Sequence, residues 1–545
     1  MTIFTANDFT SVGARQYRVR KGDIVPLARG LWTDEVKAAP VDVVEENWIE
    51  IVGKMLPGAV ISDRSALAMR PVDGVLFVSH RRTSPLELPG LTVYPDGKAD
   101  DHRDGDVPID RHGNLYASST ARALIDNAEM RGRPGAVPRR LTREELHDEV
   151  VKIVTTYTPR QVENLLAAVD RDANRAAAET VRVFVDAARG RINTVKSSSR
   201  AMNAAQRGEA FDHARVALFR QVVADLQRLA PVQRYVTDQR RAQMVPFYEA
   251  YFSNYIEGST LTIDEAQQVV FHRADVGKPE DAHDITSTYE IVADHAEMSR
   301  RPSDAVQFMD SLRDRHRIMM AAHPAKRPGE WKTQRNQAGA TVFVDPSHVP
   351  GTLRAGWEEA AALTDPFQRA VYMMFMVSEV HPFADGNGRS ARVAMNAELV
   401  PANLHRIIIP TVLRSDYMSG LLRTTAGNGP EGLHRVLSFA QSWVARGEFA
   451  DLEIADRYLR ATNALVEADH ADREGIYLRL LRTGELEELG DVAYPRATAP
   501  TPGPSIADEA LAEADVLAAR QRRFPERLRD SAEPEHPDSD DIELD

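Results

Sequence analysis

One run of twelve residues, His381 to Arg392, holds the kinds of group that chemistry on a phosphate requires. His381 is a candidate general base, because an imidazole accepts a proton near neutral pH. Asp385 supplies a carboxylate, the type of ligand that a hard divalent cation prefers. The run therefore indicates proton transfer beside a metal-bound anion.

The middle of the same run predicts an anion-binding turn. Gly386, Asn387 and Gly388 accept positive φ at little cost, so that their backbone N–H groups converge on an anion. Arg389 and Arg392 follow at a spacing that places both guanidiniums in the first turn of a helix. A guanidinium binds phosphate oxygens bidentately, and the whole set suits the phosphates of a nucleotide.

The flanking sequence predicts two helices that position this loop. A stretch rich in apolar residues, about Asp365 to Val380, precedes it, and an alanine-rich stretch, Ser390 to Val400, follows it. The loop then lies at the N-terminus of the second helix, where the macrodipole adds to the attraction of an anion.

The run from His381 to Arg392 matches HPFx(D/E)GNGRxxR at every fixed position, and in this it resembles the Fic family. The resemblance implies transfer of AMP from ATP to a Ser, Thr or Tyr hydroxyl of a target protein, or of the chain itself. It assigns proton removal to His381, Mg²⁺ to Asp385, and the phosphates to the glycine turn and both arginines. Pyrophosphate is the leaving group.

A second segment, Ser253 to Gly258, ends a helix predicted from about Arg241. A glutamate at a helix C-terminus opposes the macrodipole and costs up to about 1 kcal/mol unless a cation compensates. The segment resembles the inhibitory motif of the family, whose regulatory residues here are Ser253 and Glu257. The resemblance implies that Glu257 pairs with Arg392 and blocks placement of the γ-phosphate.

Two further segments match family features. Residues 328–336 and 339–344 predict a hairpin that resembles the flap, which aligns a target segment by main-chain pairing. Lys332 stands in it where an arginine is common. Tyr417 has the spacing of an aromatic residue that contacts the adenosine in relatives, and a plain core tyrosine is the alternative.

Two other functions remain open at this point. In some relatives the inhibitory glutamate positions a water molecule, so that the site removes AMP from a modified target. Alternatively, the chain is a DNA-binding, antitoxin-like regulator whose Fic site senses nucleotide.

Composition limits the remaining classes. The chain has 545 residues, 43% of them hydrophobic, which is typical of a globular protein with several domains. It has no cysteine, which excludes a disulfide scaffold. It shows neither a signal sequence nor an apolar run of about 20 residues, so we expect a cytoplasmic protein without a membrane anchor. A net charge of −14 argues against extensive binding to nucleic acid.

The N-terminal region has a different pattern. A hairpin is predicted at Ile24 to Trp32, a helix near Val44 to Met55 and a strand near Gly58 to Ile61. The region resembles the AbiEi-type antitoxin and regulator domain, which begins with a winged helix. Weak DNA contact by this domain and pairing with a second copy of the chain, as a homodimer, are the further partners considered.

The predicted fold is mainly α, a helical Fic core behind a small winged-helix-like α/β domain. Helices are expected from Phe211 through Arg241, and the serine-rich residues 196–200 are expected to be a surface hinge. The expected divisions are an AbiEi-like domain at 1–135, a helical connector at 136–200, a Fic domain at 201–465 with the inhibitory helix at about 241–258, a helical extension at 466–494, and a disordered acidic tail at 495–545.

Overall fold

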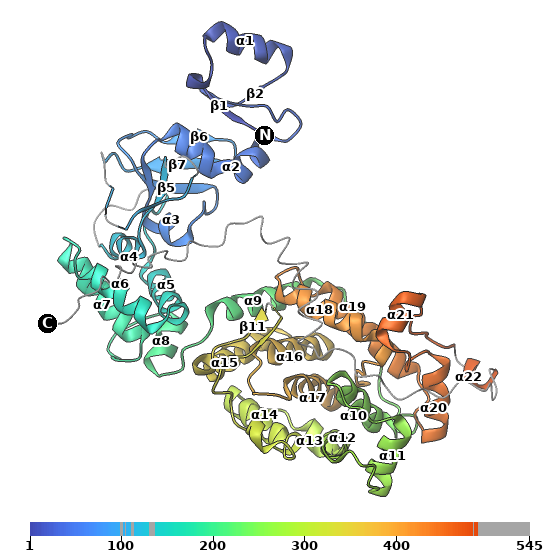
Figure 1. Cartoon of the computed structure of the whole chain (residues 1–545). Helices are drawn as coiled ribbons and strands as arrows, with labels where there is room; N and C mark the ends of the chain where they lie inside the picture. The colour runs from blue at the N-terminus through green and yellow to red at the C-terminus, as the bar shows by residue number, and fades with distance from the viewer. Residues whose placement is uncertain are drawn as a thin grey trace, which may run out of the picture. The chain divides into compact units, whose positions relative to one another are not determined.

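The computed structural model describes residues 1–98, 102–103, 105–110, 114–129, 137–339, 341–482 and 484–488. The protein is mainly α-helical, as the sequence predicts, and it divides into two units, Met1–Asp212 and His213–Asp545 (Figure 1). The predicted acidic tail at 495–545 lies outside the described residues. No helix in the described part of the chain is long and apolar enough to cross a membrane.

The first unit begins with a three-stranded antiparallel sheet. Its order is β1 (Ile3–Thr5), β3 (Leu31–Thr33) and β2 (Val25–Ala28), so the predicted hairpin is confirmed. Helix α1 (Val12–Lys21) connects β1 to β2 and buries none of its side chains.

A mixed six-stranded sheet forms the centre of this unit. Helix α2 (Pro40–Met55) and strand β4 confirm the predicted helix and strand. Apolar side chains of α2 and of the sheet make one core cluster. In spatial order the strands are β6 (Leu86–Leu88), β7 (Leu91–Pro95), β5 (Val75–Ser79), β4 (Ala59–Ile61), β9 (Leu115–Ala117) and β8 (Val107–Pro108).

Helices complete the first unit. They are α3 (Asp63–Ala68), α4 (Thr120–Ala128), α5 (Arg143–Thr156), α6 (Pro159–Val169), α7 (Arg175–Ala188) and α8 (Arg200–Gln206). Helix α5 begins with a capping box between Thr142 and Glu145. Because α4 packs against α5, α6 and α7, residues 1–135 and the predicted connector belong to one unit.

The serine-rich segment at 196–200 is fixed, so the expectation of a hinge there is wrong. Ser197 Oγ lies 2.6 Å from His147 Nδ1, and Ser199 Oγ donates to Asp148 Oδ1 at 2.6 Å. Ser198 Oγ donates to Glu144 Oε2 at 2.8 Å. The partners of the three serines, Glu144, His147 and Asp148, all belong to α5, which therefore holds this segment in place.

We expect a fragment of residues 1–212 to unfold in one cooperative thermal transition, and a fragment of residues 1–135 not to do so. Leu124 and Ile125 of α4 are fully buried, and the shorter fragment lacks the helices that cover them. Circular dichroism melting of both fragments checks this. A sharp transition in the shorter fragment would contradict it.

The second unit starts with α9 (His213–Arg228), and the expected continuation of helix to Arg241 is wrong. Pro231 has no N–H to donate and disfavours helix in the residue before it, so α9 ends. Residues 229–244 are largely irregular, with a single bridge from Val236 to Leu404. The next helix, α10 (Val245–Ile256), has a proline in its first turn and begins four residues later than predicted.

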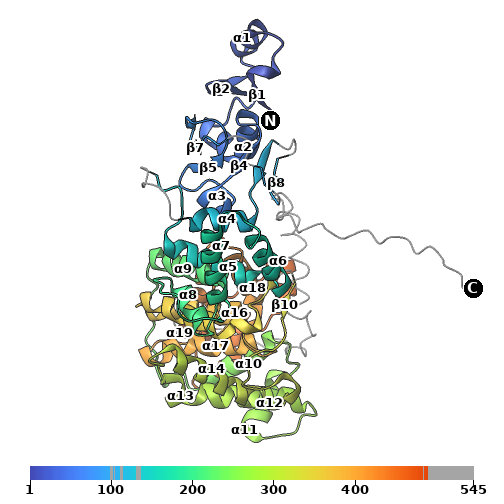
Figure 2. The same ribbon diagram turned by 90° about the vertical axis from the view of Figure 1, so that its left-hand side faces the viewer.

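Helices α16 and α17 lie side by side in the middle of this unit (Figures 1 and 2). Strands β10 (Gln337–Ala338) and β11 (Thr341–Val342) pair antiparallel, as the predicted flap hairpin requires. The remaining helices of the unit are α11 (Ile263–His272), α12 (Pro279–Ala293), α13 (His295–Ser299), α14 (Ala305–Met319), α15 (Val349–Glu359), α16 (Pro366–Val380), α17 (Asn387–Leu399), α18 (Arg414–Thr425), α19 (Glu431–Arg446), α20 (Leu452–Ala461), α21 (Ala468–Glu474) and α22 (Glu485–Glu488).

Candidate active site

The loop between α16 and α17 has the predicted helix–loop–helix geometry. His381 ends α16 with φ of 51° and Gly386 caps α17 with φ of 71°, so both lie in the left-handed region. A Cβ at Gly386 would also lie 2.7 Å from Met320 Sδ. Helix α17 begins at Asn387 rather than at the predicted Ser390, which brings the glycine turn into the helix N-terminus.

Asn387 holds the loop together through its side chain. Its Oδ1 accepts from the Phe383 N–H at 2.8 Å, and its Nδ2 donates to the Phe383 carbonyl at 3.0 Å. The side-chain amide is thus satisfied within the loop. The backbone N–H groups of Asn387 and Gly388 have no partner inside the helix, because they belong to its first turn. These N–H groups are the ones available to an anion.

His316 of α14 fixes the same loop from the other side. Its Nδ1 accepts from the Gly329 N–H at 2.9 Å, so the proton is on Nε2, which lies 3.0 Å from the Asp385 carbonyl oxygen. Its ring stacks on Phe383 with centroids 3.7 Å apart. Burial lowers the pKa of His316 to about 4, and the ring is neutral. Sequence reasoning missed this residue, which belongs to no recognisable motif.

His381 has the protonation state that a general base needs. Its Nδ1 lies 3.2 Å from the Ser378 carbonyl oxygen. Since a carbonyl only accepts, Nδ1 carries the proton and Nε2 keeps a free electron pair. The ring stacks on Phe343 of the flap with centroids 3.8 Å apart. Burial, with the nearby Lys332, lowers the pKa of His381 to about 4, so the imidazole is neutral at physiological pH.

We expect His381 in the nucleotide-free protein to titrate with a pKa of about 4 rather than 6.5. An unfolded chain takes up this proton near pH 6.5 and the folded protein only near pH 4, so acidification through this window lowers the free energy of unfolding. Proton NMR of the imidazole, assigned with His381→Ala, measures the midpoint. A midpoint at 6.5 or above would contradict the expectation that burial lowers the pKa of His381.

Lys332 links the flap to the end of α16. It is buried, and its Nζ donates to Asn336 Oδ1 at 2.6 Å and to the Val380 carbonyl at 3.4 Å. Burial lowers its pKa to about 7. A lysine reaches these two single acceptors without needing the planar fork of the arginine common at this position.

Glu257 and Arg392 form the ion pair that the inhibitory motif implies. Arg392 Nη2 donates to Glu257 Oε1 at 2.7 Å, and Arg392 Nε donates to Ser253 Oγ at 3.0 Å. The side chains of Glu257 and Arg392 are 17% and 5% exposed. A Cβ at Gly388 would collide with the Glu257 carboxylate. The carboxylate therefore lies against the first turn of α17, where an anion is expected.

The last turn of α10 has a second attachment. Glu257 is the C-cap of α10, and Gly258 follows in the left-handed region with φ of 95°. Within this turn, the Tyr255 hydroxyl donates to the carboxylate of Glu467, the residue before α21. Residues far from the motif thus hold the turn that carries Glu257.

Arg389 has different partners from Arg392. Its Nη1 donates to Asp284 Oδ2 of α12 at 2.5 Å and lies 3.3 Å from Asn254 Oδ1. Asp284 also lies 2.9 Å from His323 Nε2. The structure thus brings Arg392 to Glu257 but ties Arg389 to Asp284, an acidic residue that the sequence did not indicate as part of the site.

Asp385 is the candidate metal ligand. Its Oδ1 accepts from the Gly386 N–H at 2.7 Å, its Oδ2 lies 3.1 Å from Lys326 Nζ, and its side chain is 44% exposed. Burial opposes ionisation, but the Gly386 N–H and Lys326 lower the pKa of Asp385. Within the described ranges, no three His, Cys, Asp or Glu side chains form a metal-binding group. One ionised carboxylate suits Mg²⁺, which takes its other ligands from phosphates and water.

Tyr417 of α18 is fully buried, and its hydroxyl lies 3.3 Å from Met374 Sδ. Burial raises its pKa, and a hydrogen bond from Arg392 opposes this. Tyr417 is therefore buried beside Arg392, and its contact with an adenosine stays a prediction.

The part of the chain that carries this site is similar to known proteins. Residues 309–399 match the model of the Fic/DOC family. The Caenorhabditis elegans protein adenylyltransferase fic-1 is 25% identical over 186 residues, which are 32% of this chain and 36% of the relative. The Drosophila persimilis protein adenylyltransferase Fic is 29% identical over 195 residues, 35% of this chain and 38% of the relative. The chain therefore spans little more than a third of the length of these relatives.

Two solved structures are also similar. Residues 134–508 of C. elegans Fic-1 align with a TM-score of 0.33 and 17% identity, covering 59% of this chain and 89% of that one. A Fic domain containing signaling protein from Bacteroides thetaiotaomicron aligns with a TM-score of 0.32 and 20% identity, covering 43% and 99%.

Proposed function

We propose that the chain transfers AMP from ATP to a hydroxyl side chain of a target protein, because residues 309–399 match the model of the Fic/DOC family. The observation that carries the proposal is the neutral His381 beside the N-terminus of α17. A base and an anion-binding helix end are the two elements that this transfer requires. The names of the relatives, protein adenylyltransferases, support the same reaction.

In the proposed reaction, His381 Nε2 takes the proton from the target hydroxyl. The hydroxyl oxygen bonds to the α-phosphorus, and the bond from that phosphorus to the bridging oxygen breaks. Pyrophosphate leaves with the electron pair of that bond. The backbone N–H groups of Asn387 and Gly388 stabilise the charge on the phosphates, together with the Arg392 guanidinium once Glu257 has moved away.

Asp385 is the residue that would hold Mg²⁺, since its carboxylate is ionised, partly exposed and next to the anion-binding turn. When bound, the ion would neutralise part of the negative charge on the phosphates. Lys326 occupies one oxygen of this carboxylate in the nucleotide-free protein.

The target segment lies, in this proposal, against the flap. Val342 of β11 is 53% exposed and Phe343 stacks on His381, so a strand that pairs with β11 brings its hydroxyl to the base. We propose further that the target is cytoplasmic, that the chain modifies itself, and that it forms a homodimer. Incubating the chain with labelled ATP and a host lysate, followed by mass spectrometry, tests it. Absence of any AMP adduct, including with Glu257→Gly, would refute the proposal.

A second function, DNA contact, is favoured by one feature of the N-terminal unit. Helix α1 carries Arg15, Arg18, Arg20 and Lys21, has no acidic residue and buries none of its side chains. Arg15 and Arg18 stack on Trp32 and Phe4, and Lys21 Nζ lies 3.4 Å from Asp23 Oδ2, which leaves Arg20 for phosphates. Fluorescence anisotropy with duplex DNA at rising salt tests this. Equal binding by the Arg20→Glu, Lys21→Glu variant would exclude α1 as the contact.

A further inference from the structure

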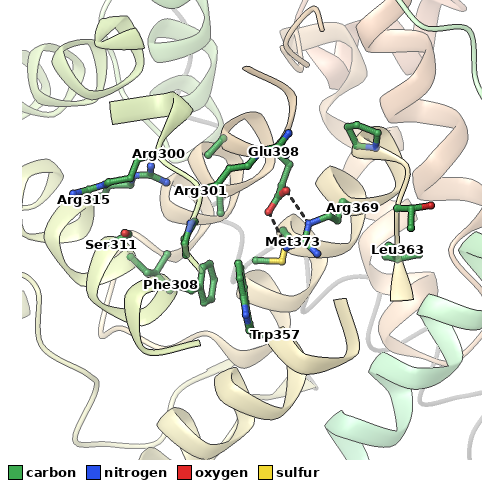
Figure 3. A pocket seen from close by; sticks show the side chains of 16 residues that line it. Arg300, Arg301, Phe308, Ser311, Arg315, Trp357, Leu363, Arg369, Met373 and Glu398 are labelled. Carbon is green, nitrogen blue, oxygen red and sulfur yellow. Dashed lines mark hydrogen bonds and ion pairs between the residues drawn. The ribbon is translucent and has the colours of Figure 1, made fainter. Parts of the chain in front are cut away.

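A cavity of about 300 Å³ lies in the second unit, away from the catalytic loop (Figure 3). It is bounded by the segment after α13, by α14 and α15, and by one end of the α16–α17 pair. Its volume is at the small end of the range for ligand pockets, about 300–1,000 Å³. None of residues 381–392 lines it.

The cavity is separate from the nucleotide site. Arg369 contributes to it from the N-terminal part of α16, whereas His381 follows the C-terminus of the same helix. The eleven steps of helix from Arg369 to Val380 correspond to about 16 Å, and on α17 the lining begins at Ala394, two residues after Arg392. The cavity is thus lined by parts of α16 and α17 outside the loop residues 381–392.

Positive charge dominates the lining. Arg300, Arg301, Arg315 and Arg369 line the cavity, and Glu398 is the acidic residue among the lining side chains. Arg369 Nε donates to Glu398 Oε2 at 2.9 Å, which satisfies one arginine. Four guanidiniums thus face a single carboxylate within the lining.

The next carboxylate, Glu297, does not neutralise the remainder. It accepts from Arg315 Nε at 2.9 Å and from Arg300 Nη2 at 2.8 Å, so one charge serves two arginines. With both glutamates counted, four positive groups meet two negative ones. Among these six side chains, the guanidiniums outnumber the carboxylates by two.

Two polar groups at the cavity have no protein partner. Arg301 makes no hydrogen bond or ion pair with any residue that the structure describes, and it is exposed at the rim. Ser311 lines the interior, is 8% exposed, and its hydroxyl likewise has no partner in the described chain. Both groups can bond to a ligand oxygen.

The other side of the cavity is apolar and aromatic. Phe308 and Trp357 stack with centroids 4.8 Å apart, and Leu312 and Met373 are buried beside them. Figure 3 shows these rings between the arginines of the two sides. Such a wall favours a flat apolar group, and guanidiniums also stack on ring faces.

We propose that this cavity binds a small aromatic anion, a ring compound carrying one phosphate or carboxylate group. The ring packs against Phe308, since the Arg369 guanidinium already lies over the Trp357 ring at 5.2 Å, and the anionic group bonds to Arg301 and the Ser311 hydroxyl. Phosphate and carboxylate each present two oxygens that the planar guanidinium binds together. The packing of the ring should make an aromatic anion bind more tightly than an inorganic one. This site is independent of the proposed AMP transfer.

The test is calorimetric titration of the full chain with phenyl phosphate and, separately, with benzoate. We expect saturable binding of at least one, with inorganic phosphate and benzyl alcohol each binding at least tenfold more weakly. The probe that binds more tightly shows whether the site prefers a phosphate or a carboxylate group. Failure of both to bind, or equal binding of inorganic phosphate, overturns the proposal.

Variants locate the bound probe. Arg301→Glu should weaken binding at least tenfold without unfolding the protein, because this side chain is exposed and unpaired in the described structure. Arg435→Glu is the matched control, an exposed arginine of α19 that should leave affinity within twofold. Quenching of tryptophan fluorescence by the probe should disappear in Trp357→Phe. Unchanged binding in Arg301→Glu, or displacement of the probe by saturating ATP, overturns the proposal.

Discussion

Replacing Glu257 by glycine is expected to raise AMP transfer at least tenfold. The Glu257 carboxylate pairs with Arg392 at 2.7 Å and lies against the first turn of α17, where the phosphates are proposed to bind. Removing it frees both the guanidinium and the space beside Gly388. A tenfold effect corresponds to about 1.4 kcal/mol, a modest value for a largely buried ion pair that competes directly with substrate.

One gel with labelled ATP, comparing the wild type, Glu257→Gly and a double variant with Arg392→Ala, measures this effect. The double variant should lose the gain, because no guanidinium remains for the phosphates. Glu280→Gly is the matched control, since the Glu280 side chain is 74% exposed and its pairing with His323 spans 3.8 Å. It should stay within twofold of the wild type. Equal labelling of wild type and Glu257→Gly would reject inhibition by this helix.

The same variant separates transfer from removal of AMP. If Glu257 positions a water molecule for removal, Glu257→Gly should lose the release of AMP from a premodified target. If Glu257 acts only as an inhibitor, this variant gains transfer and shows no such loss. Both assays use the same protein preparation.

The second large effect concerns His381. His381→Ala, made in the Glu257→Gly background for signal, should lower AMP transfer at least a hundredfold, within the about 10²–10⁴-fold that a general base contributes. Binding of ATP should change little, because the proton moves only in the transition state. Label incorporation and calorimetric ATP binding measure the two quantities on the same variant.

His295→Ala is the control for this experiment, because His295 is exposed at the start of α13 and distant in the chain from the loop. It should retain full activity. A His381→Ala variant that keeps a tenth of the transfer rate would reject the base assignment. Asp385→Ala should differ from both by losing the Mg²⁺ dependence of ATP binding.

The parts of the site that lie within one short segment were predictable. The helix–loop–helix geometry follows from glycines and apolar periodicity within residues 365–400, and the pairing of Glu257 with Arg392 follows from two motifs of fixed spacing. These features depend on local backbone preference or on a family pattern, both of which a single sequence contains.

The supporting residues were not predictable, for a physical reason. His316, Lys326 and Asp284 reach the loop and its arginine from 59 to 105 positions earlier in the chain, and each is a single polar residue on an ordinary helix or turn. Their roles depend on tertiary packing, for which a single sequence carries no periodic signal. The packing of α4 onto α7 is likewise invisible in composition.

In the proposed inhibition, Glu257 lies at the very end of α10, so that the opening of one turn would be enough to free Arg392. Such a local opening has its own free energy, separate from that of unfolding the whole helix. The hydrogen bond from Tyr255 to Glu467 opposes that opening from outside the catalytic region. We therefore expect the proposed inhibition to behave as a local opening equilibrium whose midpoint depends on the segment preceding α21.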